Sequence, residues 1–436
     1  MKTMIETARW MCIAVGVAMA AQVSAQTWTA PVVLSTGGQG WEAGAAIDGD
    51  GNSLAVWEEI TTQSQLWSRA KANGANWGSV TEVSPALQTT SVFPAVRVTT
   101  AGFATAVWSD SNGVWTADRP SGSKWDAAQL VIPGSANPIF VMNSRGDAAI
   151  AWSVGGGPRS TSGSVMAVLR PAGGEWSAQE TVASGAHLIV DHAGIGDSGE
   201  VIVTWETYTA VCQRYGCSQT NYLLHASRQN TGSGAWADSG SLQGPDLTAH
   251  DARVELDSAG GAILLAHSSS GVYTSATQGN SGGAWSAFKA AVNPQGSVII
   301  ADLAGDDAGQ VTLVYECITY PTSQALAVNG AIANNAWSSP VVLSGVDTSV
   351  GQVYFAQAPN GASLATWLSS SGTPAVHAVT RASATGTWSA PASISGPLSY
   401  ISPEAAAVEP NGNGMVIYSG YNAASVHTEY AINYLP

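Results

Sequence analysis

Aromatic and acidic side chains recur in this sequence directly after short apolar runs or directly before the next one. Aromatic rings can stack on the apolar faces of sugars, and carboxylates accept hydrogen bonds from hydroxyl groups. Together, on a concave surface, they suit recognition of a glycan or a peptide. The alternative is that loops simply collect polar residues without binding anything. The candidate ligand-binding residues are Trp41, Glu42, Glu59, Tyr208, Tyr215, His250, Asp251, Tyr320 and Tyr400.

Pairs of carboxylates offer a second kind of chemistry. Glu58 with Glu59, or Glu206 with Asp251, would suit a glycoside hydrolase or lyase if their carboxyl groups lay about 5 to 10 Å apart. The histidines show neither His-x-x-x-His nor His-Glu-x-x-His spacing. We therefore favour non-catalytic binding of an extracellular glycan or protein, and keep a polysaccharide-acting hydrolase or lyase as the alternative.

The segment DGDGN places side-chain oxygens at alternate positions, on Asp48, Asp50 and Asn52, as calcium loops do. Tight hairpin turns favour the same residues. The twelfth position of such a loop would be Glu59, which falls inside an apolar run expected to be a strand. We therefore expect a turn and no cofactor, with calcium as the alternative reading.

Residues 1–25 have the pattern of a secretion signal, since Lys2 and Arg9 precede an apolar run that ends in small residues up to Ala25. We expect a secreted or periplasmic protein. No later stretch approaches the roughly 20 apolar residues of a membrane span. The net charge of −15 disfavours nucleic acids and anionic membranes as partners.

Export also bears on the cysteines. Cys212 and Cys217 are five residues apart in VCQRYGCSQ, and an oxidising compartment favours a disulfide between them. Cys317 is then left over, and we expect it to be a buried free thiol at the end of a strand.

A phrase similar to TWSAP recurs eight times at intervals of 48 to 60 residues. Its tryptophans are Trp28, Trp77, Trp125, Trp176, Trp236, Trp285, Trp337 and Trp388. Between successive copies lie apolar runs separated by Gly, Asn and Asp, as in tight hairpins. The pattern predicts four short strands per unit. Residues 26–436 are therefore expected to form a single all-β domain, a β-propeller of four-stranded antiparallel blades. One tryptophan per unit at a fixed place would pack between neighbouring blades.

The ends of the chain bear on the number of blades. The Trp28 phrase corresponds to a fourth strand with no preceding three, and the last segments, EAAAVEP, GMVIYSG and VHTEYAINYL, supply three strands with no fourth. Joining them pairs backbone groups that an open ring would leave free. We predict eight blades, closed by the N-terminal strand completing the last one. Seven blades are the alternative if the weak fifth unit is interpreted differently.

The segments before these tryptophans resemble the Asp-box of sialidase-like β-propellers, Ser-x-Asp-x-Gly-x-x-Trp. Four glycines fall three residues before their tryptophans: Gly74, Gly122, Gly173 and Gly282. The aspartate position is held instead by Ala72, Pro120, Pro171 and Asn280. The resemblance implies the propeller fold. Sialidase activity does not carry over, because sialidases hold the substrate carboxylate with three arginines and only Arg97 and Arg253 fall in first-strand segments.

Overall fold

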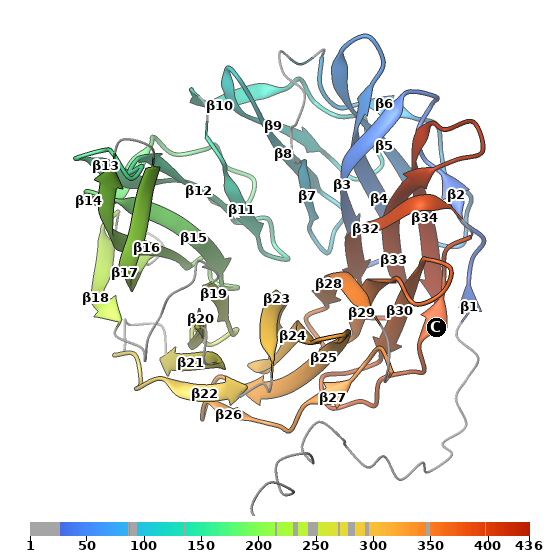
Figure 1. Ribbon diagram of the computed structural model, residues 1–436. Coiled ribbons are helices and arrows are strands. Elements are labelled where there is room, and N and C mark those ends of the chain that lie inside the picture. Colours follow the sequence, from blue (N-terminus) through green and yellow to red (C-terminus); the bar gives the residue numbers. More distant parts are fainter. Residues whose placement is uncertain are drawn as a thin grey trace, which may run out of the picture.

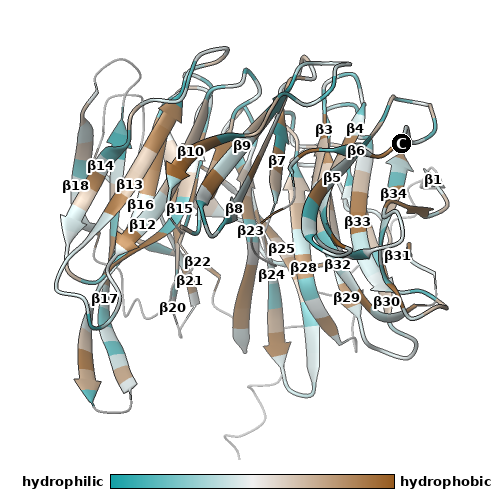
Figure 2. Cartoon of the chain, turned by 90° about the horizontal axis from the view of Figure 1, so that it is seen from above, coloured by the Kyte–Doolittle hydropathy of each residue, from teal (hydrophilic) through white to brown (hydrophobic). Residues whose placement is uncertain are grey.

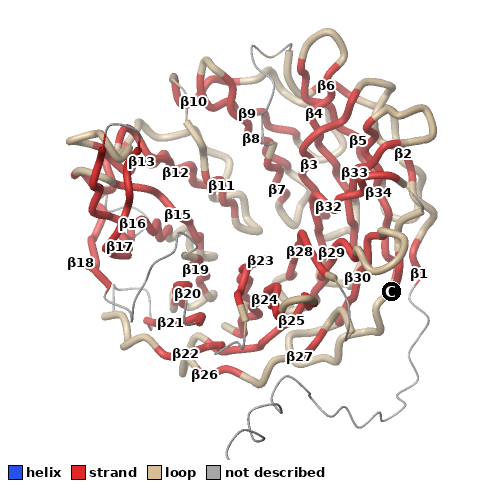
Figure 3. The backbone as a smooth tube through the Cα atoms, viewed as in Figure 1, coloured by secondary structure: helices blue, strands red, loops and turns tan. Residues whose placement is uncertain are grey.

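The computed structural model of the protein describes residues 27–436, except for positions 86, 88–93, 135, 214–215, 230–233, 243–251, 269–270, 278–283, 293–295, 346–348 and 397. The proposed secretion signal, residues 1–25, lies outside the described residues. The described part consists of strands, turns and loops (Figure 3), and it contains no helix that could cross a membrane.

Eight antiparallel sheets are arranged around a central channel, as Figure 1 shows in a view along the axis of the ring. The eight-bladed β-propeller predicted from the repeat is therefore confirmed, and the seven-bladed alternative is wrong. The first strand of each blade faces the channel. These inner strands are β3 (Gln39–Ile47), β7 (Ala95–Val98), β11 (Ile139–Met142), β15 (Leu188–Ile195), β19 (Arg253–Leu256), β23 (Ser297–Gly305), β28 (Val350–Gln357) and β32 (Ser399–Val408). We number the blades 1 to 8 in that order.

The remaining strands follow outward from the channel. Second strands are β4 (Ser53–Ile60), β8 (Ala104–Asp110), β12 (Ala148–Gly155), β16 (Val201–Gln213), β20 (Ala262–Ser268), β24 (Gln310–Thr319), β29 (Ser363–Ser369) and β33 (Gly414–Tyr421). Third strands are β5 (Ser64–Lys71), β9 (Gly113–Arg119), β13 (Gly163–Arg170), β17 (Gly216–Gln229), β21 (Gly271–Thr277), β25 (Thr322–Ala331), β30 (Ala375–Arg381) and β34 (His427–Leu435). Outer strands are β6 (Thr81–Glu82), β10 (Gln129–Pro133), β14 (Glu180–Gly185), β18 (Trp236–Leu242), β22 (Lys289–Val292), β26 (Ala336–Trp337) with β27 (Val341–Val342), and β31 (Ala392–Ser393).

The ring closes as the sequence predicted. The outer strand of blade 8 comes from the start of the chain, as β1 (Thr27–Trp28) and β2 (Val32–Val33), and both pair with β34. Trp28 lies opposite Tyr434, and Val33 lies opposite Tyr430. This pairing satisfies the edge of blade 8 and joins the two ends of the domain.

The core lies between neighbouring blades rather than inside any one of them. One apolar cluster, for example, joins Val56 of blade 1 to Trp108 of blade 2, and another joins Leu265 of blade 5 to Tyr315 of blade 6. The most deeply buried aromatics are those of the second strands, including Trp57. Full burial of one tryptophan is worth at most about 4 to 6 kcal/mol at ~25 cal/mol per Å².

The repeated tryptophans of the TWSAP phrase are only half-buried, but they do bridge blades. The indole N–H of Trp125 donates to Ser68 Oγ of the preceding blade at 2.7 Å, and that of Trp337 donates to Thr274 Oγ1 at 2.8 Å. Three of the turns before them hold a glycine with a positive φ, 72° at Gly74, 69° at Gly122 and 68° at Gly173. These turns lack the aspartate, and the structure does not confirm an Asp-box.

The two faces of the ring carry different connections. The turn face carries the tight turns between first and second strands. The loop face carries the hairpins between second and third strands and the connections into the first strands, because strand direction alternates within each blade. The β16–β17 hairpin extends furthest beyond the ring in Figure 2. The predicted Cys212–Cys217 disulfide lies at its tip, and Cys317 is a buried free thiol near the end of β24.

Candidate functional site

The predicted ligand-binding residues separate into several places. Trp41 and Tyr400 line one pocket on the loop face where blade 8 meets blade 1, and Glu42 follows Trp41 in β3. Tyr208 lies in blade 4, where its buried hydroxyl donates to Gly156 O at 2.8 Å. Tyr320 is 94% exposed at the β24–β25 turn. Tyr215, His250 and Asp251 lie outside the described residues.

Glu59, which the sequence suggested as a ligand-binding residue, is instead hydrogen-bonded to other residues of the protein. Its carboxylate accepts hydrogen bonds from Thr36 Oγ1 at 2.6 Å, Gly38 N at 2.8 Å and Trp57 Nε1 at 3.1 Å, as well as from Thr36 N. Burial raises the pKa of this carboxyl, but these hydrogen bonds outweigh burial and hold the pKa below its ordinary value. The ionised Glu59 anchors the segment that enters blade 1.

The structure separates one carboxylate pair of the hydrolase hypothesis, and the other pair lies partly outside the described residues. Glu58 and Glu59 are neighbours in β4 and therefore point to opposite faces of the sheet. Ser64 Oγ donates a hydrogen bond to Glu58, whereas Glu59 is bound to Thr36. Glu206 is buried in β16, and its proposed partner Asp251 lies outside the described residues.

The calcium candidate forms a turn. Asp48 Oδ1 accepts hydrogen bonds from the backbone N–H groups of Asp50 and Asn52 at 3.0 and 2.8 Å, and Asp48 Oδ2 accepts one from the Asn52 amide. Within the described part of the chain, no three His, Cys, Asp or Glu side chains come together as a metal site. The Asp48 oxygens are thus already used in holding the hairpin between β3 and β4.

An aromatic pocket opens on the loop face at the seam of blades 8 and 1. It is lined by Trp41, Ser399, Tyr400, Tyr421, Ser425 and His427 and has a volume of about 430 Å³. The Trp41 ring stacks on His427, with centroids 4.4 Å apart and planes at 16°. Tyr421 meets His427 edge-on at 5.0 Å, and Tyr400 meets Tyr421 edge-on at 5.9 Å. Four rings therefore form one continuous wall.

Two β-bulges aim the side chains of this pocket. The register of β3 shifts between Trp41 and Ala43, and Glu42 there has a φ of 48°. The register of β32 shifts between Ser399 and Ser402, and Tyr400 has a φ of 51°. A left-handed conformation is costly for such residues and is typical of places where a fold redirects a side chain. Tyr400 is 84% exposed, and Trp41 is 37% exposed.

Three carboxyl groups lie close enough to influence one another beside this pocket: Glu42, Glu404 and Glu429. Burial and then the Glu404, Glu42 and Glu59 charges raise the pKa of Glu429 well above its usual value. Burial also raises the pKa of Glu404 to about 7, with a further increase from Glu42. Partial burial and the Glu58 charge raise the pKa of Glu42. At neutral pH the cluster therefore carries fewer charges than carboxyl groups.

Glu429 is fully buried, and neither of its carboxyl oxygens has a hydrogen-bond partner among the described residues. It lies against β3, where a Cβ at Gly40 would approach Glu429 Cγ to 2.7 Å. Any side chain at position 40 would therefore collide with it. The glycine allows the last strand of the chain to bring a carboxyl group beside Trp41 and Glu42.

Sequence reasoning missed the half of this site that comes from the end of the chain, namely Glu404, Tyr421, His427 and Glu429. These residues lie within strands, whereas ligand-binding residues were expected in loops. The sequence did contain one signal for them, namely the predicted closure of the ring. Because the last strands of the chain pair with the N-terminal segment, they must also lie beside blade 1.

No protein-family model and no curated protein matches the chain. Solved structures similar to it include the Dos1 propeller, with a TM-score of 0.53 and 7% identity over 93% of this chain and 94% of that one. A puromycin hydrolase complexed with PGG has a TM-score of 0.50 and 14% identity over 88% of this chain, which spans 58% of the hydrolase. The NanB sialidase of Streptococcus pneumoniae has a TM-score of 0.40 and 12% identity over 92% and 70%. At these identities the likeness concerns the β-propeller fold alone.

Proposed function

We propose that the protein is a secreted glycan-binding β-propeller that holds a neutral sugar chain in the aromatic pocket. The observation that carries the proposal is the continuous wall of Trp41, His427, Tyr421 and Tyr400 around a cavity of about 430 Å³. Aromatic walls complement the C–H faces of sugar rings, and the rim serines offer hydroxyl groups for hydrogen bonding.

The charge around the pocket supports a neutral ligand over an anionic one. The chain carries a net charge of −15, and the residues that line the pocket include neither lysine nor arginine. A sialylated or uronic-acid glycan would be repelled by this field. The Cys212–Cys217 disulfide agrees with an oxidising compartment, and a protein exported to such a compartment has access to extracellular glycans.

A glycan array with the purified protein tests the proposal, and the Tyr400→Ala variant is the sharpest comparison. The Tyr400 side chain is 84% exposed, so its removal leaves the core intact. Loss of one stacking ring should weaken binding about tenfold, or ~1.4 kcal/mol. Tyr320→Ala is the matched control, because that tyrosine is 94% exposed elsewhere on the same face. An array without neutral glycan signals, or equal effects of the two variants, would reject the pocket.

A hydrolase or lyase is the second candidate, and one observation favours it. The Glu404 carboxyl, whose pKa burial raises to about 7, is suited to donate a proton at neutral pH. Release of reducing ends from a bound polysaccharide, abolished by Glu404→Gln with affinity retained, would favour catalysis. Binding without turnover would leave the non-catalytic proposal in place.

A further inference from the structure

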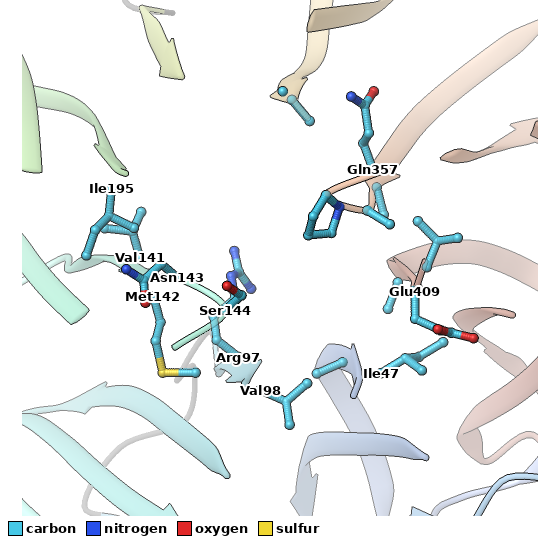
Figure 4. Close-up of a pocket in the computed structure, with 18 of the residues that line it drawn as sticks. Ile47, Arg97, Val98, Val141, Met142, Asn143, Ser144, Ile195, Gln357 and Glu409 are labelled. Carbon is cyan, nitrogen blue, oxygen red and sulfur yellow. The ribbon is translucent and has the colours of Figure 1, made fainter. Parts of the chain in front are cut away.

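A second cavity of about 430 Å³ opens on the turn face, at the opposite mouth of the channel from the face that carries the aromatic pocket. The ends of the first strands and the turns that follow them form its walls. Figure 4 shows Arg97 extending from the wall between Val98 and Ser144, with Gln357 and Glu409 on the far side. The volume lies within the range of small-molecule sites, about 300 to 1,000 Å³.

Titratable groups from six blades line this cavity. Arg97 belongs to blade 2, His192 to blade 4, Glu255 to blade 5 and Asp302 to blade 6. Asp48 of blade 1 and Glu409 of blade 8 also line it, but their carboxylates accept hydrogen bonds within their own turns. Arg97 is exposed and the Asp302 side chain is 41% exposed, so a ligand can reach both groups from the cavity. Their convergence on one cavity points to a ligand site.

Arg97 is not joined to the acidic groups of the cavity by a direct ion pair. It donates one hydrogen bond, to the carbonyl of its neighbour Val96 at 3.0 Å. Glu255 and Asp302 act on Arg97 through space, but among the described residues neither approaches it within ion-pair distance. Asp302 instead makes a long ion pair with Arg253, at 3.9 Å. The guanidinium of Arg97 and the two carboxyl groups thus line the same cavity and leave room between them.

His192 adds a neutral polar group. Burial, with the charges of Arg253 and Arg97, lowers the pKa of His192 to about 3, so the ring is uncharged at neutral pH. Its Nδ1 accepts a hydrogen bond from the Val254 N–H at 3.3 Å. The ring proton must therefore be on Nε2, which makes His192 a donor at the cavity wall.

We propose that this cavity binds a small zwitterion of the α-amino-acid type, with its carboxylate at Arg97 and its ammonium group at Glu255 and Asp302. A purely anionic ligand would be disfavoured by the two carboxyl groups, and a purely cationic ligand would be repelled by the guanidinium. A molecule with both charges a few bonds apart would supply Arg97 and Glu255 with the charged partners that they lack among the described residues.

Binding should also release a proton. Burial and the Asp302 charge raise the pKa of Glu255 well above its usual value, which favours the protonated carboxyl in the free protein. An ammonium group placed against it favours the ionised form. The heat of binding should therefore depend on the ionisation enthalpy of the buffer.

The test is calorimetric titration of the full chain with the common amino acids and glycyl dipeptides at millimolar concentration. The best ligand is then compared with its amide, which lacks the carboxylate, and with the corresponding acid that lacks the amine. We expect each single-charge analogue to bind at least tenfold more weakly. Absence of binding by every zwitterion, or equal binding of an analogue, would overturn the proposal.

Three variants locate the site. Arg97→Gln and Glu255→Gln should each raise the dissociation constant at least tenfold, and Glu255→Gln should also remove the buffer dependence of the heat. Arg145→Gln is the control, because this arginine is 56% exposed in a turn of the same face and does not line the cavity. Wild-type affinity in a folded Arg97→Gln or Glu255→Gln protein would place the ligand elsewhere and refute the assignment. Circular dichroism verifies folding, and either variant alone suffices for the decision.

Discussion

The carboxyl groups at the seam of blades 8 and 1 should make the stability of the protein fall as pH rises. Burial raises the pKa of Glu404 to about 7, whereas an exposed glutamate has a model value of 4.5. Between these values the folded protein holds a proton that the unfolded chain has released. The free energy of unfolding therefore decreases across this window and levels off once Glu404 is ionised in both states.

The size of the effect follows from the shift. One pKa unit corresponds to about 1.36 kcal/mol, so Glu404 alone accounts for about 3 kcal/mol between pH 4.5 and 7 as an upper value. Glu429 adds to it in the same direction, because its pKa is also raised. With an unfolding entropy of ~2 cal/mol/K per residue, a chain of about 400 residues should lose about 3 to 4 °C in melting temperature.

Thermal unfolding of the wild type and of Glu404→Gln at pH 5 and pH 8 measures this. The glutamine cannot ionise, so the variant should lose most of the difference between the two pH values and be the more stable protein at pH 8. Glu82→Gln serves as control, since Glu82 lies on an exposed outer strand. A wild type more stable at pH 8 than at pH 5, or an unchanged pH dependence in Glu404→Gln, would refute the reasoning.

Three further predictions concern local features of the blades. Gly113→Ala should unfold the protein or lower its free energy of unfolding, measured by urea titration, by more than about 4 kcal/mol, because the new Cβ would lie 1.9 Å from a carbonyl oxygen of β10. Gly122→Ala, which has open space around it, should lower the free energy of unfolding by only about 1 kcal/mol. Replacing both Cys212 and Cys217 by serine should leave the melting temperature within about 1 °C and instead speed amide hydrogen exchange at the hairpin tip, because the bridge closes only a short exposed loop. Arg381→Met should lower the free energy of unfolding by about 3 kcal/mol, since the buried guanidinium donates five hydrogen bonds and lies 4.6 Å from an indole ring, and a loss below 1 kcal/mol would contradict this role.

Local sequence determined the fold to a large extent. Each blade is built from hairpins between consecutive segments, so turn residues and apolar runs are visible at short range. The repeat then gave the number of blades, and the unmatched segments at the two ends predicted that the N-terminal strand completes the last blade, where Val33 pairs with Tyr430. The Cys212–Cys217 disulfide was equally accessible, because both residues belong to one hairpin.

Contacts across the ring were decided by the tertiary structure alone. His427 Nδ1 hydrogen-bonds to the Gly40 carbonyl and stacks on Trp41 although 387 residues separate His427 from Gly40. Arg97 likewise shares a cavity with Asp302 from the other side of the channel. Such pairs depend on bulges and on the rotation between sheets, and neither leaves a periodic signal in the residues concerned. The sequence therefore specified which strands form and how the ring closes, while the closed ring determined which side chains meet.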